Sequence, residues 1–165
     1  MNAGPMTRPS SKKGEIVANL VPMTKLLPAA VISLVQLLEN WRAMDPLPEG
    51  VTREELVGAA LTLAPLMAPS DPKSYAVALE RLFTVLPRPT KESLKVWREL
   101  LARYPTKTLH MAVDTVIMGH KWQTPPTIAE MVEACQQDAG FKELCGWKHR
   151  IDTALWKLKM TSRSS

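Results

Sequence analysis

The chain has 165 residues, of which 45% are hydrophobic and 22% are charged, and its formal net charge is +5. A chain of this length buries roughly 70% of its unfolded surface, so it needs no disulfide or metal staple. Its two cysteines and three histidines form no zinc-binding pattern. There is no run of ~18 apolar residues and no signal-peptide core. We therefore expect reduced thiols, no metal or cofactor, and a cytoplasmic protein.

The positive charge is concentrated at the two ends of the chain. Residues 1–14 contribute +3 and residues 141–165 contribute +4, so the part between them carries about −2. Basic ends can bind phosphate backbones or an acidic protein surface, or they can be solvated tails that keep the protein soluble. Residues 1–14 contain almost no apolar side chains and are predicted to be a disordered basic arm.

Residues 15–86 are predicted to form an N-terminal helical half. Its first apolar run is interrupted by Pro22 and Pro28, so the first firm helix is expected over residues 29–44. One face of that helix is apolar and is predicted to be core. Its residues are Val31, Leu34, Val35, Leu38 and Trp41.

Two further helices are predicted in this half from their start signals. Thr52 followed by Glu55 has the spacing of a capping box, so a helix begins there, and Pro65 either ends it early or kinks it. Asp71 followed by Pro72 is an N-cap with proline at the first helical position. A second helix is therefore expected to begin at Pro72.

The proline-containing segment 86–90 is predicted to be a stiff linker that divides the chain into two halves. Residues 90–140 then read as a three-helix unit. Thr90 caps its first helix, Pro105 follows the end of that helix, and Thr106 opens the second. Apolar side chains wrap more than one face of the second helix, so we expect it to be packed on two sides.

The connection to the third helix carries an aromatic residue of special interest. Residues 121–126 must be extended because a residue before proline is pushed out of the helical region. Trp122 lies in this loop and either plugs a gap between helices or offers a docking surface. Thr127 with Glu130 forms a second capping box that starts the third helix.

Residues 141–165 are predicted to be a basic amphipathic helix and tail, with the helix over about 141–160. Ala139 and Gly140 are a possible cap of the preceding helix, although the two helices can also be continuous. Trp147 and Trp156 are nine residues apart, so at least one is exposed if the helix stands alone. An exposed tryptophan among basic residues suits a partner groove or single-stranded nucleic acid. The alternative is that this helix folds back onto the bundle.

These observations define a set of predicted partner-binding residues and a fold class. The predicted partner-binding residues are Trp122, Leu144, Trp147, Lys148, Arg150, Ile151, Leu155 and Trp156. No run of alternating β-branched residues indicates a strand. The fold predicted is all-α, an irregular bundle of about six or seven helices that ends in the basic amphipathic helix.

No residue pattern predicts catalysis. His110 and Asp114 are four apart on one helix face, but no nucleophile pattern lies near them, so a polar contact is the favoured interpretation. Acidic pairs in first turns are better explained by the helix dipole than by metal binding or acid–base chemistry. These pairs are Glu54 with Glu55 and Glu130 with Glu133. We expect no catalytic and no metal site, and therefore a protein that is not an enzyme.

The run from Trp97 to Met131, WRELLARYPTKTLHMAVDTVIMGHKWQTPPTIAEM, resembles the helical domain of phage-encoded loaders of the replicative helicase, the loader-and-inhibitor type. The matching positions are Trp97, Tyr104, Pro105, Ala112, Val113, Pro126, Thr127, Ile128 and Glu130. The resemblance implies a protein of the host cytoplasm that binds the hexameric helicase and delivers or restrains it in DNA replication. The chain departs from that pattern in its long apolar half before Leu86 and in its basic C-terminal helix, where a flexible helicase-binding tail is expected. The helicase contact is therefore not assigned to the matched residues.

Two other functions remain open on the sequence. A phage inhibitor of a host machine, of the anti-CRISPR kind, fits the small size, basic charge and absent chemistry equally well. Direct DNA binding through the helices that begin at Thr106 and Thr127 is the third. The second of these helices carries Glu130, Glu133 and Asp138 and no basic residue, which opposes contact with phosphates. The partner expected is a protein, with DNA possible through the basic ends, and no membrane or small-molecule substrate is expected.

Overall fold

The computed structural model describes residues 23–121 and 123–164. Within these residues the chain forms a short 3-10 helix, seven α-helices and no strand. The elements are η2 (Met23–Leu26), α1 (Ala29–Glu39), α2 (Arg53–Met67), α3 (Pro72–Val85), α4 (Lys91–Leu101), α5 (Thr106–Gly119), α6 (Ile128–Gln136) and α7 (Ala139–Thr161). The prediction of an all-α fold is confirmed. The predicted basic arm, residues 1–14, lies outside the described residues, as does Trp122.

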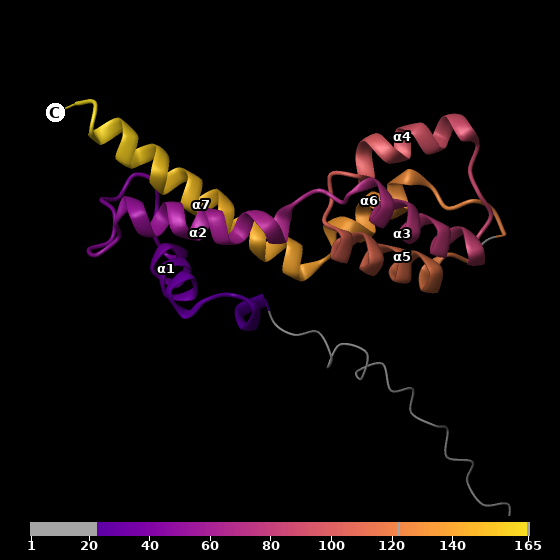
Figure 1. Ribbon diagram of the computed structural model, residues 1–165, viewed down its shortest axis with the longest axis horizontal. Coiled ribbons are helices and arrows are strands. Elements are labelled where there is room, and N and C mark those ends of the chain that lie inside the picture. Colours follow the sequence, from indigo (N-terminus) through magenta and orange to yellow (C-terminus); the bar gives the residue numbers. More distant parts are fainter. Residues whose placement is uncertain (1–22, 122, 165) are drawn as a thin grey trace, which may run out of the picture.

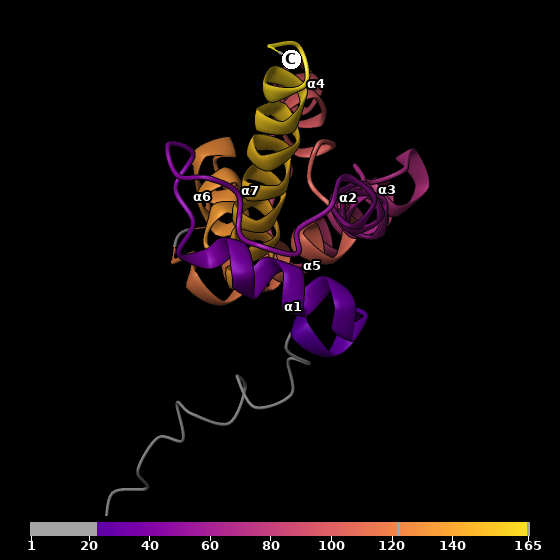
Figure 2. The ribbon, with the colours of Figure 1, turned by 90° about the vertical axis from the view of Figure 1, so that its left-hand side faces the viewer.

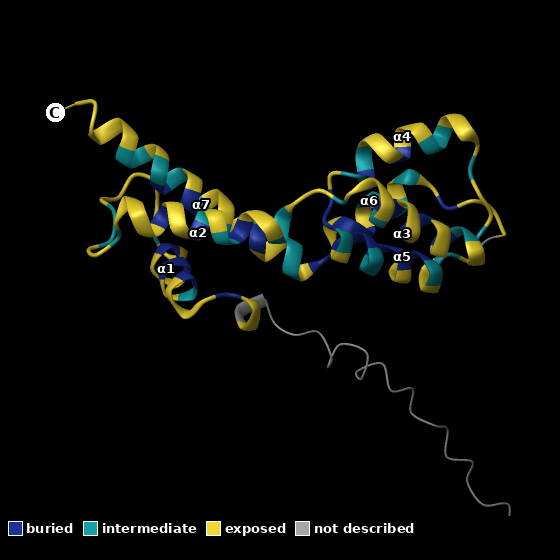
Figure 3. Ribbon diagram, in the orientation of Figure 1, coloured by how far each residue is buried: buried dark blue, intermediate teal, exposed yellow. Residues whose placement is uncertain are grey.

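The helices gather into two lobes, each with its own apolar core (Figure 1). The first lobe consists of α1, α2 and most of α7, and the second consists of α3, α4, α5 and α6. Figure 3 shows the buried residues concentrated between the helices of each lobe. Along the chain up to α6, the boundary between residues of the first core and residues of the second core therefore lies between α2 and α3. The predicted division at residues 86–90 places α3 with the N-terminal half, whereas α3 packs on α5 in the second lobe.

Helix starts follow the local signals read from the sequence. The side chains of Thr52 and Thr127 each accept a hydrogen bond from the backbone N–H three residues on, at 3.2 Å. Glu55 and Glu130 complete both capping boxes by accepting from the backbone of the cap residue. Asp71 caps α3 in the same way, at 2.9 Å from the backbone nitrogen of Ser74. These bonds satisfy backbone donors that a helix start leaves free.

The first helix is shorter than the sequence indicates. It was expected over residues 29–44, but α1 ends at Glu39. The reason is the turn that follows, in which the indole nitrogen of Trp41 donates to the carbonyls of Asp45 and Pro46 at 3.3 and 3.1 Å. By contrast, α2 continues through Pro65 to Met67, so that proline does not end the helix.

Asp138 separates α6 from α7 and fixes the start of α7. One of its carboxylate oxygens accepts from the backbone nitrogen of Gly140 at 3.1 Å, which makes Asp138 the N-cap of α7. The other accepts from the hydroxyl of Thr108 at 2.8 Å in a buried contact. Gly140 is therefore in the first turn of α7 and is not a cap of α6. One residue further on, Phe141 packs edge-on against Tyr104, with ring centroids 5.5 Å apart.

The remainder of α7 crosses from the second lobe to the first and runs along α2 (Figures 1 and 2). Leu144, Ile151 and Ala154 on its inner face are buried in the core of the first lobe. The C-terminal helix thus folds back onto the bundle, which is one of the two alternatives that the sequence left open.

Ile151→Ala tests whether α7 is part of the first core. Because Ile151 is fully buried, the substitution is expected to lower the free energy of unfolding by about 2–5 kcal/mol. The matched control on the same helix is Met160→Ala, where the side chain is exposed and the change should stay within about 0.5 kcal/mol. Chemical denaturation followed by circular dichroism measures both. Equal stability of the two variants would contradict the packing of α7 on α1 and α2.

Candidate protein-docking surface

The two cysteines offer no reactive thiolate. Burial, together with the nearby carboxylate of Asp138, raises the pKa of Cys135 to about 12. Burial also raises the pKa of Cys145, against the opposing effect of the Lys148 ammonium. A thiol is a nucleophile only as the thiolate, so at neutral pH neither cysteine is poised to attack a substrate.

Two negative findings concern the described residues only. In residues 23–121 and 123–164 no group of three or more His, Cys, Asp or Glu side chains is placed to hold a metal ion. Over the same residues no helix combines the length and the apolar content that crossing a membrane requires.

His110 and Asp114 make polar contacts at the surface of the second lobe, the interpretation that the sequence favoured. Both meet Arg81 of α3, whose guanidinium lies 3.3 Å from the Nδ1 atom of His110 and forms an ion pair with Asp114. Arg81 and Asp114 are both about half exposed. The trio links α3 to α5 across the surface of the second lobe. Arg81 could not be found from the sequence because it lies 29 residues from His110 and no spacing rule connects them.

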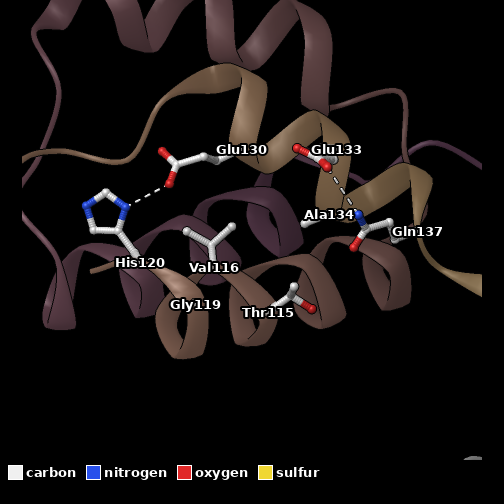
Figure 4. Close-up of a pocket in the computed structure, with 8 residues that line it drawn as sticks. All are labelled: Thr115, Val116, Gly119, His120, Glu130, Glu133, Ala134 and Gln137. Carbon is white, nitrogen blue, oxygen red and sulfur yellow. Dashed lines mark hydrogen bonds and ion pairs between the residues drawn. The ribbon is translucent and has the colours of Figure 1, made fainter. Parts of the chain in front are cut away.

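The buried side chain of His120 contacts both α6 and the segment that connects α5 to α6 (Figure 4). The side chain of His120 is 3% exposed, and its Nδ1 atom lies 2.8 Å from Oε1 of Glu130. Its Nε2 atom lies 2.7 Å from the carbonyl oxygen of Thr124. Both neighbours are acceptors, so an imidazolium, which has an N–H on each nitrogen, can donate to both. The two contacts hold the two ends of the segment together.

A hollow lies beside this histidine. It is small, about 190 Å³, and opens between α5 and α6. The hydroxyl among its lining residues, that of Thr115, donates to the carbonyl of Met111 within its own helix. Glu133 accepts a hydrogen bond from Gln137, as Figure 4 shows. With no free nucleophile in the lining, we interpret the His120–Glu130 pair as a structural clamp.

A hollow with an exposed tryptophan in its lining lies between α2 and α7, and we call it the Trp156 groove. It is a hollow of about 550 Å³. Its lining residues are Arg53 and Val57 of α2, Leu155, Trp156, Leu158 and Lys159 of α7, and Ser162. Trp156 is 56% exposed, and Leu61, one helical turn beyond Val57, is also exposed. A contiguous apolar surface that includes a tryptophan is characteristic of protein interaction sites.

The structure separates the apolar residues predicted to bind a partner into two sets. Leu155 and Trp156 line the groove. Leu144 and Ile151 are buried against α1 and α2, and Trp147 packs, partly buried, on the same core. This corrects the prediction that Leu144 and Ile151 lie in a partner's groove, because the apolar faces of α1 and α2 already cover them.

The predicted basic residues of α7 divide in the same way. Lys148 is exposed and pairs with Asp152 one turn further along the helix. Arg150 points back to α1, with its guanidinium 3.4 Å from the carbonyl oxygen of Leu38, so it is also corrected from a partner contact to an internal one. Lys157 donates to the carbonyls of Ala43, at 2.9 Å, and Asp45. Loop and helix-end carbonyls thus take two cations of α7, of which Arg150 was expected to face a partner.

Sequence reasoning missed the contribution of α2 to the groove. Val57 and Leu61 are four residues apart, and both point away from the core that Leu56 and Leu63 enter. The sequence contains this signal as apolar residues on a second face of the helix, but only the packing of α7 beside α2 joins it to Trp156.

Comparison with family models, curated proteins and solved structures finds no match to this chain.

Glu130→Gln tests the clamp through its pH dependence. The Thr127 backbone N–H and the His120 side chain lower the pKa of Glu130, with burial opposing them. A carboxylate whose pKa is lower in the folded state stabilises the fold above its unfolded pKa and loses this effect as the pH falls through the folded pKa. The variant should therefore be less stable at pH 7, by less than about 1 kcal/mol because the site is partly exposed, and the difference should vanish in acid.

Thermal unfolding between pH 3 and pH 7 measures this effect. Glu133→Gln is the matched control, since it removes a carboxylate from the same helix that contacts neither His120 nor the cap. A difference between Glu130→Gln and the wild type that did not change with pH would refute the electrostatic part of the clamp.

Proposed function

We propose that this protein is a non-enzymatic adaptor that binds a partner protein through the Trp156 groove. Trp156 carries this proposal because it remains 56% exposed on a helix whose other large apolar side chains are mostly buried or half-buried. Covering the exposed part of a tryptophan contributes on the order of 3 kcal/mol to binding. Tryptophan is also among the residues most enriched at the energetic centres of protein interfaces.

The partner proposed is a hexameric replicative helicase, which the adaptor delivers or restrains during DNA replication. The support is the resemblance of residues 97–131 to phage-encoded helicase loaders. These residues make up α4, α5, α6 and their connections, and Trp97, Tyr104 and Val113 lie in the core of the second lobe. The matched positions serve packing and capping, so they support the type of domain. The partner contact is assigned to the Trp156 groove on a separate ground, the exposure of Trp156 there.

The charges around the groove suit an acidic partner surface. Arg53 and Lys159 are part of its lining, which contains no acidic residue. Charges at the edge of an interface mainly raise the association rate and make it sensitive to salt. Complex formation is therefore expected to slow as the ionic strength rises, with a smaller effect on the dissociation rate.

Trp156→Ala is expected to weaken binding to purified replicative helicase by at least about 30-fold, the loss typical of a central tryptophan in an interface. Met118→Ala is the matched control, because Met118 is 73% exposed on α5 of the second lobe. Binding is measured by biolayer interferometry with and without nucleotide, and thermal unfolding verifies that both variants remain folded.

Four outcomes would contradict the proposal. No complex at micromolar protein, in either nucleotide state, removes the helicase as partner. Equal binding by Trp156→Ala and the wild type removes the groove as the contact. Recovery of a different host machine from infected-cell extract, or a gel shift with DNA that weakens steeply with salt, favours an inhibitor or a DNA-binding protein instead.

A further inference from the structure

Both helices that border the Trp156 groove present apolar side chains to solvent at helical spacing. On α2, Val57 and Leu61 are exposed and lie one turn apart. On α7, Trp156 and Met160 are exposed with the same spacing, and the half-buried side chain of Leu155 also lines the groove. Each helix therefore leaves an apolar row uncovered beside the groove.

The groove lies on the side of the α2 and α7 pair that α1 does not cover. The first helix packs against both α2 and α7. Lys157 marks the side of α7 that faces α1, because it donates to the carbonyl of Ala43 in the turn after that helix. Trp156 and Lys159 lie about 100° and 160° away from Lys157 around the helix axis. The first lobe is thus a three-helix assembly whose apolar rows away from α1 are left uncovered by the described residues.

The two ends of the groove differ in charge. Ser70 follows α2 and Asp138 precedes α7, and both are hydrogen-bonded to the second lobe, so the two helices run antiparallel (Figure 1). Arg53 at the start of α2 and Lys159 near the end of α7 therefore lie at the same end of the groove, the end far from the second lobe. Both side chains are exposed and belong to the lining.

Acidic side chains of the first lobe leave these two cations available. The lining contains no acidic residue. Asp152, one turn before Trp156 on α7, is paired with Lys148. Among residues 23–121 and 123–164 no ion pair is found for Arg53 or Lys159. One end of the groove thus offers positive charge to a ligand, and the rest of it offers apolar surface.

The backbone of the groove favours a helix over an extended segment as its occupant. The N–H and C=O groups within α2 and α7 are bonded along each helix, so they provide no edge to which a strand can pair. An extended segment on this apolar surface would leave its own backbone groups unpaired. A helix satisfies its backbone internally, and its ridge of side chains fits the groove between two packed helices.

We propose that the occupant of the Trp156 groove is an amphipathic α-helix of the partner protein that carries an aspartate or glutamate near one end. Its apolar side chains, at i, i+3 or i+4, and i+7, pack on Val57, Leu61 and Trp156, and its carboxylate meets Arg53 and Lys159. This inference rests on the proposed function and specifies the element that binds there. A second copy of the chain fits less well, because its own groove lining would bring no acid to the two cations.

The test uses a capped synthetic peptide of about 18 residues, long enough to form a helix. It consists of alanine and glutamine, with leucines along one helical face and two glutamates in the first turn. Full-length ¹⁵N-labelled protein is titrated with this peptide. Saturable shifts are expected in amides of α2 and α7 and in the indole N–H of Trp156, with half-saturation below about 1 mM.

Two control peptides separate the apolar contribution from the charged one. The first has the same composition, but its leucines are distributed around the helix, and it is expected to bind at least about tenfold more weakly. The second has glutamine in place of both glutamates and is expected to bind about threefold more weakly or less tightly still, as befits an exposed ion pair.

Variants of the protein locate each contact. Arg53→Gln combined with Lys159→Gln should abolish the preference for glutamate over glutamine and keep the dependence on the leucine face. Leu61→Ser should weaken the first peptide by about fivefold, and Met118→Ala in the second lobe is the matched control that should bind like the wild type. All these side chains are exposed, so thermal unfolding should change little.

Four results would overturn the inference. These are equal binding of the peptides with aligned and distributed leucines, a glutamate preference that survives the Arg53→Gln and Lys159→Gln changes, and no saturable shift in α2 or α7 up to about 2 mM peptide. The fourth is a set of shifts at the groove that depend on protein concentration without peptide, which would identify a second copy of the chain as the occupant.

The helicase measurement distinguishes failure of this inference from failure of the proposed function. If the helicase binds the wild type but not Trp156→Ala, and the peptide causes no shift, the groove contact stands and the helical occupant is refuted. If the peptide binds as expected and the helicase does not bind, the helical occupant stands and the helicase is refuted as the partner.

Discussion

The attachment of α7 to both cores is the constraint on which the rest of the structure depends. At its start, Asp138 accepts from the buried hydroxyl of Thr108 and Phe141 packs on Tyr104, so this end belongs to the second lobe. Further along, Ile151 and Ala154 complete the core of the first lobe. A helix of 23 residues is about 35 Å long. It is long enough to reach across both lobes and stiff enough to join them.

A second connection lies where α2 passes into α3. The backbone nitrogen and the hydroxyl of Ser70 both donate to the carbonyl of Tyr104, at 3.0 and 2.7 Å. Ser70 is thereby tied to the corner between α4 and α5, next to the ring that receives Phe141. The connection between α2 and α3 and the start of α7 thus contact the second lobe at the same place. Two short contacts there determine how the first lobe is attached.

The same constraint decides what is left for a partner. Because the inner face of α7 is used within the chain, few large apolar side chains on this helix remain exposed, and Arg150 and Lys157 satisfy carbonyls around the end of α1. Trp156 is the large exception. An adaptor needs a rigid surface with an uncovered anchor, and a helix packed along α2 supplies one with little further loss of conformational freedom on binding.

Local chemistry made much of the helical architecture predictable. The capping boxes at Thr52 and Thr127 and the N-cap at Asp71 involve residues three apart, so the groups that determine the helix start are all visible in a short stretch of sequence. The core positions Val31, Leu34, Val35 and Leu38 followed from helical periodicity for the same reason. The end of α1 and the start of α7 were misplaced because Trp41 and Asp138 act through contacts that periodicity does not describe.

Only the tertiary structure could decide which helices pack together and which side chains remain exposed. An apolar stripe shows that a helix face will be buried but not what will bury it. For this reason α3 was grouped with the N-terminal half, and Leu144 and Ile151 of α7 were expected to face a partner. The joining of Val57 to Trp156 brings together residues that are far apart in the chain and on different helices. The sequence alone therefore determined the helices and most of their boundaries, whereas long-range packing determined the candidate binding surface.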